Sequence, residues 1–341
     1  MLTEPSAAGR VTAAQSPARR RAPVKVWAAV GAVFLALQLW IYGSWLTTGE
    51  VASPAPGPTP IPDWMHVAIR VFEAGSVLGA ALFVWLLLIR PWRRAGHITL
   101  DGLFTLAFLT FFWQDPLMNF IEPWFTYNAG FVSVASWGPH IPGWSSPDGH
   151  LLPQGVVMFL PAYAYALFGG TILAGVILRR TETRWPGLRR GPLIAVCFTT
   201  LVVLDTAIEL VALRLNLWAF PGAIRWLSFF PGTRHQFPIY EAVLLGGAWT
   251  AWAALRHFRD DRGRTMVERG VDDLPAGPRA RTGLRFLALV GFCNVAYLTY
   301  NLLFAVLGTF GGPWPDDVRS RSYLNNGRCG VGTTRVACPG D

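Results

Sequence analysis

The residues with the clearest potential for chemistry are acidic side chains that stand inside long apolar stretches of the chain. An ionisable group is costly in a bilayer and usually faces the interior of a helix bundle. A carboxyl group in a dry pocket can act as a general acid, and an ionised neighbour stabilises a passing cation. Five such residues are candidate catalytic groups: Asp115, Glu122, Asp205, Glu209 and Glu241.

Helical spacing places further polar side chains on the same faces, because residues three, four and seven apart share one side of a helix. Nine of them are candidate substrate contacts: Arg70, Glu73, Asn119, Arg234, His235, Tyr240, Asn294, Tyr297 and Asn301. Structural interpretations stay open beside this one. Arg70 and Glu73 can form an intrahelical ion pair, the asparagines can join helices, and His235 can be an ordinary hydrogen-bonding histidine.

Several classes of protein are excluded by motifs that the sequence lacks. It contains no G-x-S-x-G, no H-E-x-x-H, no P-loop and no D-D-x-x-D box. The single lysine, Lys25, precedes the first apolar stretch, so no helix offers a Schiff-base lysine. The basic residues flank apolar stretches and form no separate domain, which argues against nucleic-acid binding despite the net charge of +9. We expect no metal, no cofactor and no protein partner.

The elements that position these side chains are long apolar runs, and only 14% of the residues are charged. A bilayer-spanning helix needs about 20 apolar residues. The sequence therefore predicts an all-α, multi-pass bundle in the cell membrane. The seven predicted spans are Val26–Leu46, Trp64–Ile89, Thr99–Ile121, Gly155–Leu178, Leu193–Leu213, Ile239–Leu255 and Leu284–Thr309. They form one domain over 26–309, between a disordered basic tail at 1–25 and a polar tail at 310–341.

Basic residues predict the orientation of the bundle. Alternate connections carry 21 Lys and Arg on one side and 7 on the other, which predicts an internal N-terminus and an external C-terminus. With this orientation, the polar groups of five helices fall in the outer half of the membrane, which predicts one shared polar chamber. The external 125–154 loop is either a lid on the bundle or an ordinary aromatic interface loop. Cys329 and Cys338 fall outside, where a disulfide can form.

Three segments resemble the avermectin-type spiroketal cyclases of macrolide biosynthesis, the AveC-like spirocyclase family. They are F-F-W-Q-D-P-L-M-N-F-I-E-P at 111–123, V-A-S-W-G-P-H at 134–140 and P-G-T-R-H-Q-F-P-I-Y-E-A at 231–242. The resemblance implies an enzyme that closes a keto-diol polyketide macrolide into a 6,6-spiroketal with loss of water. Some members also dehydrate a neighbouring hydroxyl, and the resemblance leaves that step open.

The resemblance agrees with the acidic residues, because spiroketal formation needs an acid, a group that stabilises an oxocarbenium ion, and a base. It requires no cofactor, and the expected partners are the lipid bilayer and a hydrophobic macrolide. Two other classes fit the residues alone. A membrane terpene cyclase also guides cations with buried acids. A small-molecule transporter is a non-enzymatic alternative, although no internal repeat typical of transporters is evident.

Overall fold

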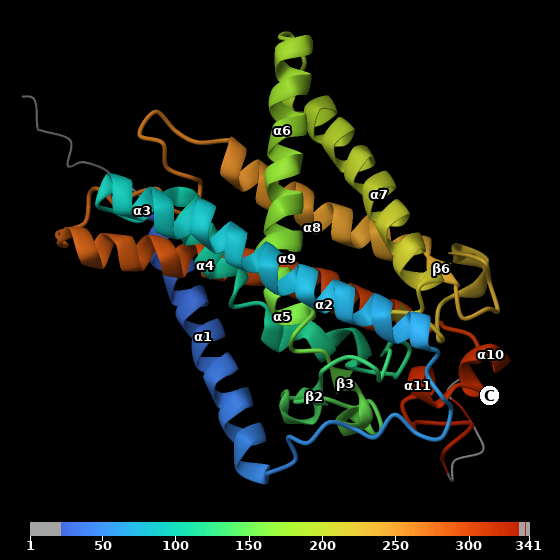
Figure 1. The fold of residues 1–341 in the computed structure, drawn as a ribbon. Helices are drawn as coiled ribbons and strands as arrows, with labels where there is room; N and C mark the ends of the chain where they lie inside the picture. The colour runs from blue at the N-terminus through green and yellow to red at the C-terminus, as the bar shows by residue number, and fades with distance from the viewer. Residues whose placement is uncertain (1–21, 334–337, 339–341) are drawn as a thin grey trace, which may run out of the picture.

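The computed structural model describes residues 22–333 and Cys338, and it is built almost entirely of helices (Figure 1). The helices are α1 (Pro23–Thr48), α2 (Asp63–Phe83), α3 (Arg90–Ala95), α4 (Leu100–Phe108), α5 (Phe159–Ala162), α6 (Phe168–Arg184), α7 (Arg190–Arg214), α8 (Ile239–His257), α9 (Pro278–Gly308), α10 (Asp316–Arg319) and α11 (Ser322–Asn325). Two π-helical turns, Val84–Ile89 and Tyr163–Leu167, join α2 to α3 and α5 to α6. Most of the predicted N-terminal tail (1–21) and parts of the C-terminal tail (334–337 and 339–341) lie outside the described residues.

Among the described residues, five helices are long and apolar enough to cross a membrane: Pro23–Thr48, Asp63–Ala95, Phe159–Arg184, Arg190–Arg214 and Pro278–Gly308. They coincide with the first, second, fourth, fifth and seventh predicted spans. The sixth predicted span is helical as α8, but it is not among these five. The chain is therefore a mostly helical protein with the character of a membrane protein.

The prediction of one continuous helix over 99–121 is wrong. The N-terminus of helix α4 is capped, because the Thr99 side chain accepts a hydrogen bond from the Gly102 N–H at 3.2 Å. It ends at Phe108, and the chain continues as a 3-10 helix from Phe112 to Asn119. Pro116 explains the change, because it lacks an N–H and disfavours α-helical geometry at the residue before it.

Helices α1 and α9 pack along each other at unusually close range. A Cβ atom added at Gly31 would lie 1.9 Å from the Leu287 carbonyl oxygen, and one at Gly291 would lie 2.3 Å from the Trp27 carbonyl oxygen. Only glycine fits where two helix backbones meet in this way. The first and last long helices of the chain are thereby joined.

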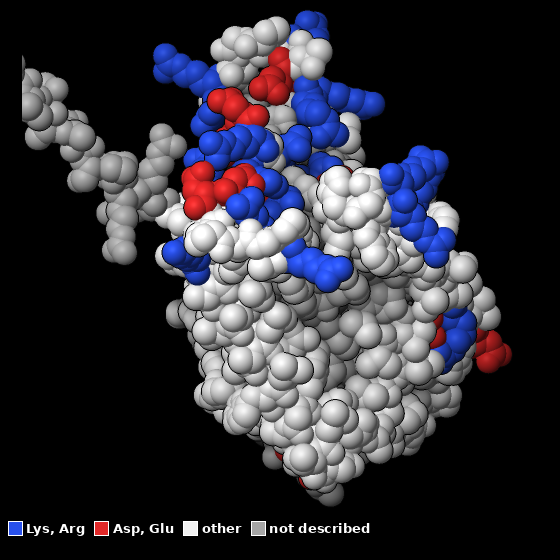
Figure 2. All heavy atoms as spheres, turned by 90° about the vertical axis from the view of Figure 1, so that its left-hand side faces the viewer, with Lys and Arg blue, Asp and Glu red and all other residues white. Residues whose placement is uncertain are grey.

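Charged side chains gather at one end of the molecule, and most of the remaining surface in Figure 2 is uncharged. Arg256 at the end of α8 makes two hydrogen bonds to Asp101 in the first turn of α4, at 2.7 and 2.8 Å. Arg285 of α9 binds Glu268 at 2.6 Å. These contacts bring together connections that the sequence places on one side of the bundle.

The opposite end carries three two-stranded antiparallel ribbons. Their strands are β1 (Thr126–Tyr127), β2 (Val134–Ala135), β3 (Pro153–Gln154), β4 (Trp218–Ala219), β5 (Ser228–Phe229) and β6 (Phe237–Pro238), paired β1 with β4, β2 with β3 and β5 with β6. The 125–154 loop is a packed cap rather than a loose connection. Its Trp137 is buried, donates to the Trp113 carbonyl at 2.8 Å and packs on Phe112.

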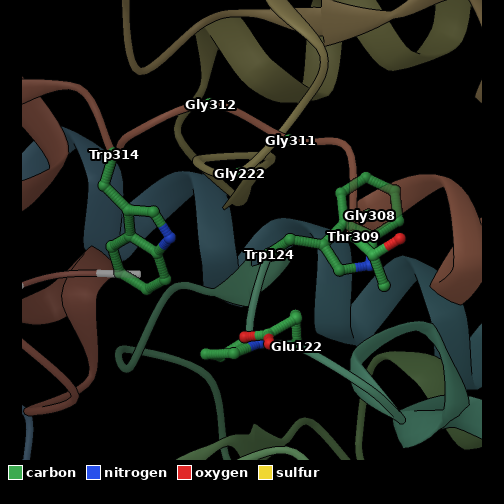
Figure 3. A pocket seen from close by; sticks show the side chains of 9 residues that line it. Glu122, Trp124, Gly222, Gly308, Thr309, Gly311, Gly312 and Trp314 are labelled. Atoms are coloured by element: carbon green, nitrogen blue, oxygen red, sulfur yellow. The ribbon is translucent and has the colours of Figure 1, made fainter. Parts of the chain in front are cut away.

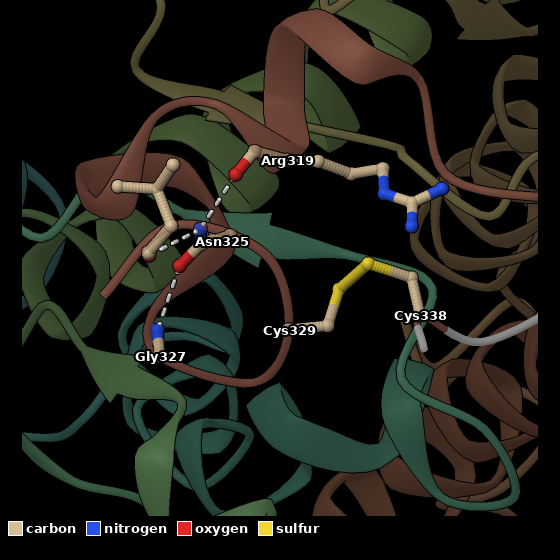
Figure 4. The surroundings of a disulfide bond; sticks show 6 residues. Arg319, Asn325, Gly327, Cys329 and Cys338 are labelled. Carbon is tan, nitrogen blue, oxygen red and sulfur yellow. Dashed lines mark hydrogen bonds between the residues drawn. A yellow bond between two sulfur atoms is a disulfide. The ribbon is translucent and has the colours of Figure 1, made fainter. Parts of the chain in front are cut away.

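The C-terminal segment closes the same end. Cys329 and Cys338 form a disulfide, a pairing that the sequence left open (Figure 4). The side chain of Asn325 donates to the carbonyl of Arg319 and accepts from the N–H of Gly327, which holds the loop before the disulfide in shape. The tail is thus anchored against the folded cap over the described part of its length.

Candidate functional site

Asp115 lies buried in the 3-10 helix, where it accepts hydrogen bonds from two tyrosines. Tyr127 Oη lies 3.0 and 3.1 Å from the two carboxyl oxygens, and Tyr163 Oη donates to Oδ1 at 2.8 Å. Tyr163 Oη also lies 2.9 Å from Tyr297 Oη. Since Tyr163 uses its only proton on Asp115, Tyr297 is the donor of that bond. Three hydroxyls and one carboxyl group form a single network.

A second group of carboxyls meets where α7, α8 and α9 converge. Tyr300 of α9 donates to Glu241 Oε1 at 2.8 Å. The Glu241 carboxyl lies beside that of Asp205, and Asp205 Oδ2 and Glu241 Oε2 find no hydrogen-bond partner among the described residues. Two buried carboxylates this close together repel each other, which favours a proton on one of the two groups.

Glu209 completes this second group from the next turn of α7. Its carboxylate accepts a hydrogen bond from Trp218 Nε1 at 2.8 Å and is half-buried. It lies close enough to Asp205 and Glu241 for their negative charges to repel one another. Such repulsion favours one shared proton over three ionised carboxylates.

Helix α9 connects the two groups. The ring of Tyr297, which belongs to the Asp115 network, stacks on the ring of Tyr300, which binds Glu241, with 5.5 Å between ring centroids. The two tyrosines are three residues apart and therefore share one helix face. The structure thus brings four of the five predicted carboxyl groups into one region, where Asp115, Asp205 and Glu241 are buried and Glu209 is half-buried. Below, this carboxyl–tyrosine cluster means Asp115, Asp205, Glu209, Glu241, Tyr127, Tyr163, Tyr297 and Tyr300.

Glu122 is the exception, and its predicted place among the buried carboxyls is wrong. It is exposed in the turn that follows the 3-10 helix. The expected common face with Asp115 required an α-helix, which the chain does not form here. Asn119 instead caps the turn, because its Oδ1 accepts the N–H groups of Trp124 and Phe125 at 3.0 and 2.9 Å. The chain turns away from the cluster at this point.

Arg70 and Glu73 fasten α2 to the 125–154 cap. Glu73 is buried and accepts the Val132 N–H at 2.6 Å, while Arg70 binds Glu73 and donates to the Gly130 carbonyl at 2.6 Å. Both side chains are therefore engaged in hydrogen bonds within the protein. The intrahelical ion pair that the spacing allowed is present.

The asparagines of α9 differ in their surroundings. The side chain of Asn294 makes its hydrogen bonds within the protein: its Oδ1 accepts from Trp113 Nε1 at 3.2 Å and from Gln114 Nε2 at 2.8 Å. It therefore joins α9 to the 3-10 helix, as a structural asparagine would. Asn301 is also fully buried, but neither its amide nitrogen nor its amide oxygen finds a hydrogen-bond partner among the described residues. Asn301 borders the cluster and Asn294 lies farther along the helix.

The segment before α8 lies at the edge of the site. Arg234 is 3.9 Å from an α10 carboxylate, and His235 Nδ1 donates to the Leu213 carbonyl at 2.8 Å. Burial lowers the pKa of His235, while its bond to the carbonyl acts in the opposite direction. The Tyr240 hydroxyl accepts the Ile224 N–H at 3.3 Å. These three side chains hold the loops around the start of α8.

Sequence reasoning missed the hydroxyl partners Tyr127, Tyr163 and Tyr300. A tyrosine in an apolar stretch is easily taken for core, although its hydroxyl usually needs a partner when it is buried. Counting tyrosines beside intramembrane acids would have been the signal. Burial and the neighbouring Asp115 raise the pKa of Tyr127 well above its usual value, so it serves as a hydroxyl donor.

The carboxyl–tyrosine cluster can release and accept protons in a region from which bulk water is excluded. No group of His, Cys, Asp and Glu suited to holding a metal ion is found in the described part of the chain. Residues 92–324 match the family model described as "Spirocyclase AveC-like". This range includes the 3-10 helix, the cap and all eight members of the cluster. No curated protein and no solved structure matches the chain.

Proposed function

Because the chain belongs to the AveC-like spirocyclase family, we propose that it is a multi-pass membrane cyclase that closes a keto-diol polyketide macrolide into a 6,6-spiroketal. The observation that carries this proposal is the pair of buried carboxyls, Asp205 and Glu241, beside the Tyr300 hydroxyl. Acid-catalysed ketal closure needs a proton donor in a dry setting. A macrolide with a large apolar surface would reach the cluster from the bilayer.

The reaction begins when one substrate hydroxyl adds to the ketone and gives a cyclic hemiketal. A general acid then protonates the hemiketal hydroxyl, which leaves as water, and the ring oxygen and carbon form an oxocarbenium ion. The second substrate hydroxyl attacks that carbon and loses its proton to a base. One ketone and two hydroxyls become one spiroketal and one water, so the acid and base are restored together.

The contacts suggest a division of roles within the cluster. Repulsion between the two carboxyls favours a proton on the Asp205–Glu241 pair, which is the candidate general acid. Asp115 is an acceptor in its network, because both tyrosines donate to it, and it is the candidate base. Glu209 lies beside the acid pair and is the candidate for stabilising the oxocarbenium ion by its charge.

Tyr297 and Tyr300 belong to this proposal as positioning residues. Their stacked rings stand between the candidate acid and the candidate base and fix the separation of the two. Asn301, one turn beyond Tyr297, offers an amide that could hold a substrate oxygen. Catalysis would then depend on fixed groups in a water-poor setting rather than on their flexibility.

The proposal is tested with membranes from a heterologous host and an open-chain keto-diol macrolide, followed by mass spectrometry. The wild-type protein should give a product lighter by one water, and loss of a second water would report the additional dehydration. Asp115→Asn, Asp205→Asn and Glu241→Gln should each reduce turnover about a hundredfold or more. Glu50→Gln, an exposed carboxylate on the same end, is the matched control. Unchanged turnover in all three cluster variants would refute the site.

A further inference from the structure

A cavity of about 230 Å³ opens beside Glu122, outside the carboxyl–tyrosine cluster (Figure 3). It lies between the turn after the 3-10 helix, the loop after β4 and the segment that follows α9. Its lining consists of Glu122, Pro123, Trp124, Gly222, Gly308, Thr309, Gly311, Gly312 and Trp314. The function proposed above makes no use of it.

Glycines let the walls of this cavity form from backbone held tightly around one indole. A Cβ atom at Gly222 would lie 2.5 Å from Trp124 Cβ, and one at Gly308 would lie 2.6 Å from Trp124 Cδ1. A Cβ atom at Gly311 would lie 1.9 Å from the Gly222 carbonyl oxygen. The cavity therefore has fixed walls rather than a lining of flexible side chains.

Two polar groups give the cavity its chemistry. Trp314 is only 2% exposed, yet its Nε1–H finds no hydrogen-bond partner among the described residues. Figure 3 shows this nitrogen turned toward the space between Trp314 and Trp124. A buried donor without a partner costs about 1–3 kcal/mol, so a ligand acceptor would be favoured here. Glu122, exposed in its turn, supplies an acceptor on another side.

This pair of groups selects among ligands. A carboxylate or phosphate would accept from Trp314 but would be repelled by Glu122. An ammonium group would bind Glu122 but has no lone pair for the indole N–H. A neutral hydroxyl satisfies both, because its oxygen accepts from Trp314 and its hydrogen is donated to Glu122.

The cavity is close to the cluster without belonging to it. The Trp124 ring lies 3.8 Å from the Phe304 ring, and Phe304 lies 5.7 Å from the Tyr300 ring, centroid to centroid. Tyr300 in turn binds Glu241. Three aromatic rings in contact, Trp124, Phe304 and Tyr300, therefore connect the cavity to Glu241, the carboxyl that we place at the reaction.

We infer that this cavity is an anchoring subsite for a hydroxyl of the oxygen-rich macrocycle that takes no part in ring closure, held between Trp314 Nε1–H and the Glu122 carboxylate. The identity of the ligand rests on the proposed function. The subsite binds substrate and finished spiroketal alike, since the anchored hydroxyl is unchanged by the reaction. It therefore contributes to affinity and to the choice of substrate, and not to the chemical step.

The test uses Trp314→Phe, which removes the N–H and keeps a ring, and Glu122→Gln, which removes the charge at an exposed position. Trp226→Phe and Glu50→Gln are the matched controls; Trp226 is 82% exposed. Each subsite variant should raise KM about three- to tenfold, the loss of one hydrogen bond, with kcat within twofold. The controls should change neither constant.

Equilibrium binding of the finished spiroketal, measured on purified protein without turnover, separates this inference from the proposed function. Both subsite variants should weaken that binding by the same factor as they raise KM. An analogue whose anchored hydroxyl is methylated should bind the wild type more weakly and be insensitive to Glu122→Gln. Unchanged KM and binding in both variants would overturn the subsite and leave the function standing. No spiroketal formed by the wild type, with weakened binding in these two variants, would overturn the proposed function alone.

Discussion

Replacing Glu241 by glutamine removes the shared proton while keeping the shape of the side chain. A glutamine amide can still accept from Tyr300 and donate to Asp205, so the contacts that hold α7, α8 and α9 together remain. What disappears is the acidic proton between two carboxyls. The variant therefore isolates the proposed acid from the packing around it.

The expected magnitude follows from the role of the proton. General acid catalysis contributes about a hundred- to ten-thousandfold, which corresponds to a barrier increase of about 3–5 kcal/mol. The free energy of unfolding should change by less than about 1 kcal/mol, since one hydrogen bond replaces another. Glu241→Ala should differ, because it leaves the Tyr300 hydroxyl buried without a partner at a cost of about 1–3 kcal/mol.

The assay measures kcat on the keto-diol substrate and the melting temperature of the same purified samples. Asp205→Asn and the Glu241→Gln, Asp205→Asn double variant complete a cycle. Because one proton serves both carboxyls, the double variant should be little less active than the less active of the two single variants. A kcat within threefold of wild type for Glu241→Gln, or fully multiplicative losses in the cycle, would refute the shared proton as the acid.

Three further predictions concern the rest of the fold. Asp101→Asn breaks a partly buried bidentate pair with Arg256 and should lower the free energy of unfolding by about 1–2 kcal/mol in thermal denaturation, with a smaller loss at high salt. Reducing the Cys329–Cys338 disulfide removes a short-loop constraint worth about 2–3 kcal/mol and should speed proteolysis of the C-terminal segment, with activity per intact molecule unchanged. His235 has a lowered pKa, so its contribution to stability is present above pH 6.5 and is lost as pH falls below it. His235→Gln should therefore make the melting temperature less dependent on pH between pH 7 and 5. An unchanged slope of melting temperature against pH would contradict this.

The apolar runs were sufficient to locate most of the helices. The predicted span Leu193–Leu213 lies within α7, and Trp64–Ile89 lies within the helical stretch Asp63–Ala95. A long apolar run has few other ways to satisfy its backbone in a membrane. The same reasoning failed at 99–121, where Pro116 changes the backbone geometry although the composition stays apolar.

The sequence by itself determined that acids lie among apolar helices, because charged residues are rare in apolar stretches and stand out in the composition. It could not determine which acids meet. That depended on a break after Phe108, which turned Asp115 inward and Glu122 outward, and on the tyrosines that α9 and the cap place against the carboxyls. Hydrogen bonds between residues far apart in the chain leave no periodic pattern, so only the tertiary structure decided them.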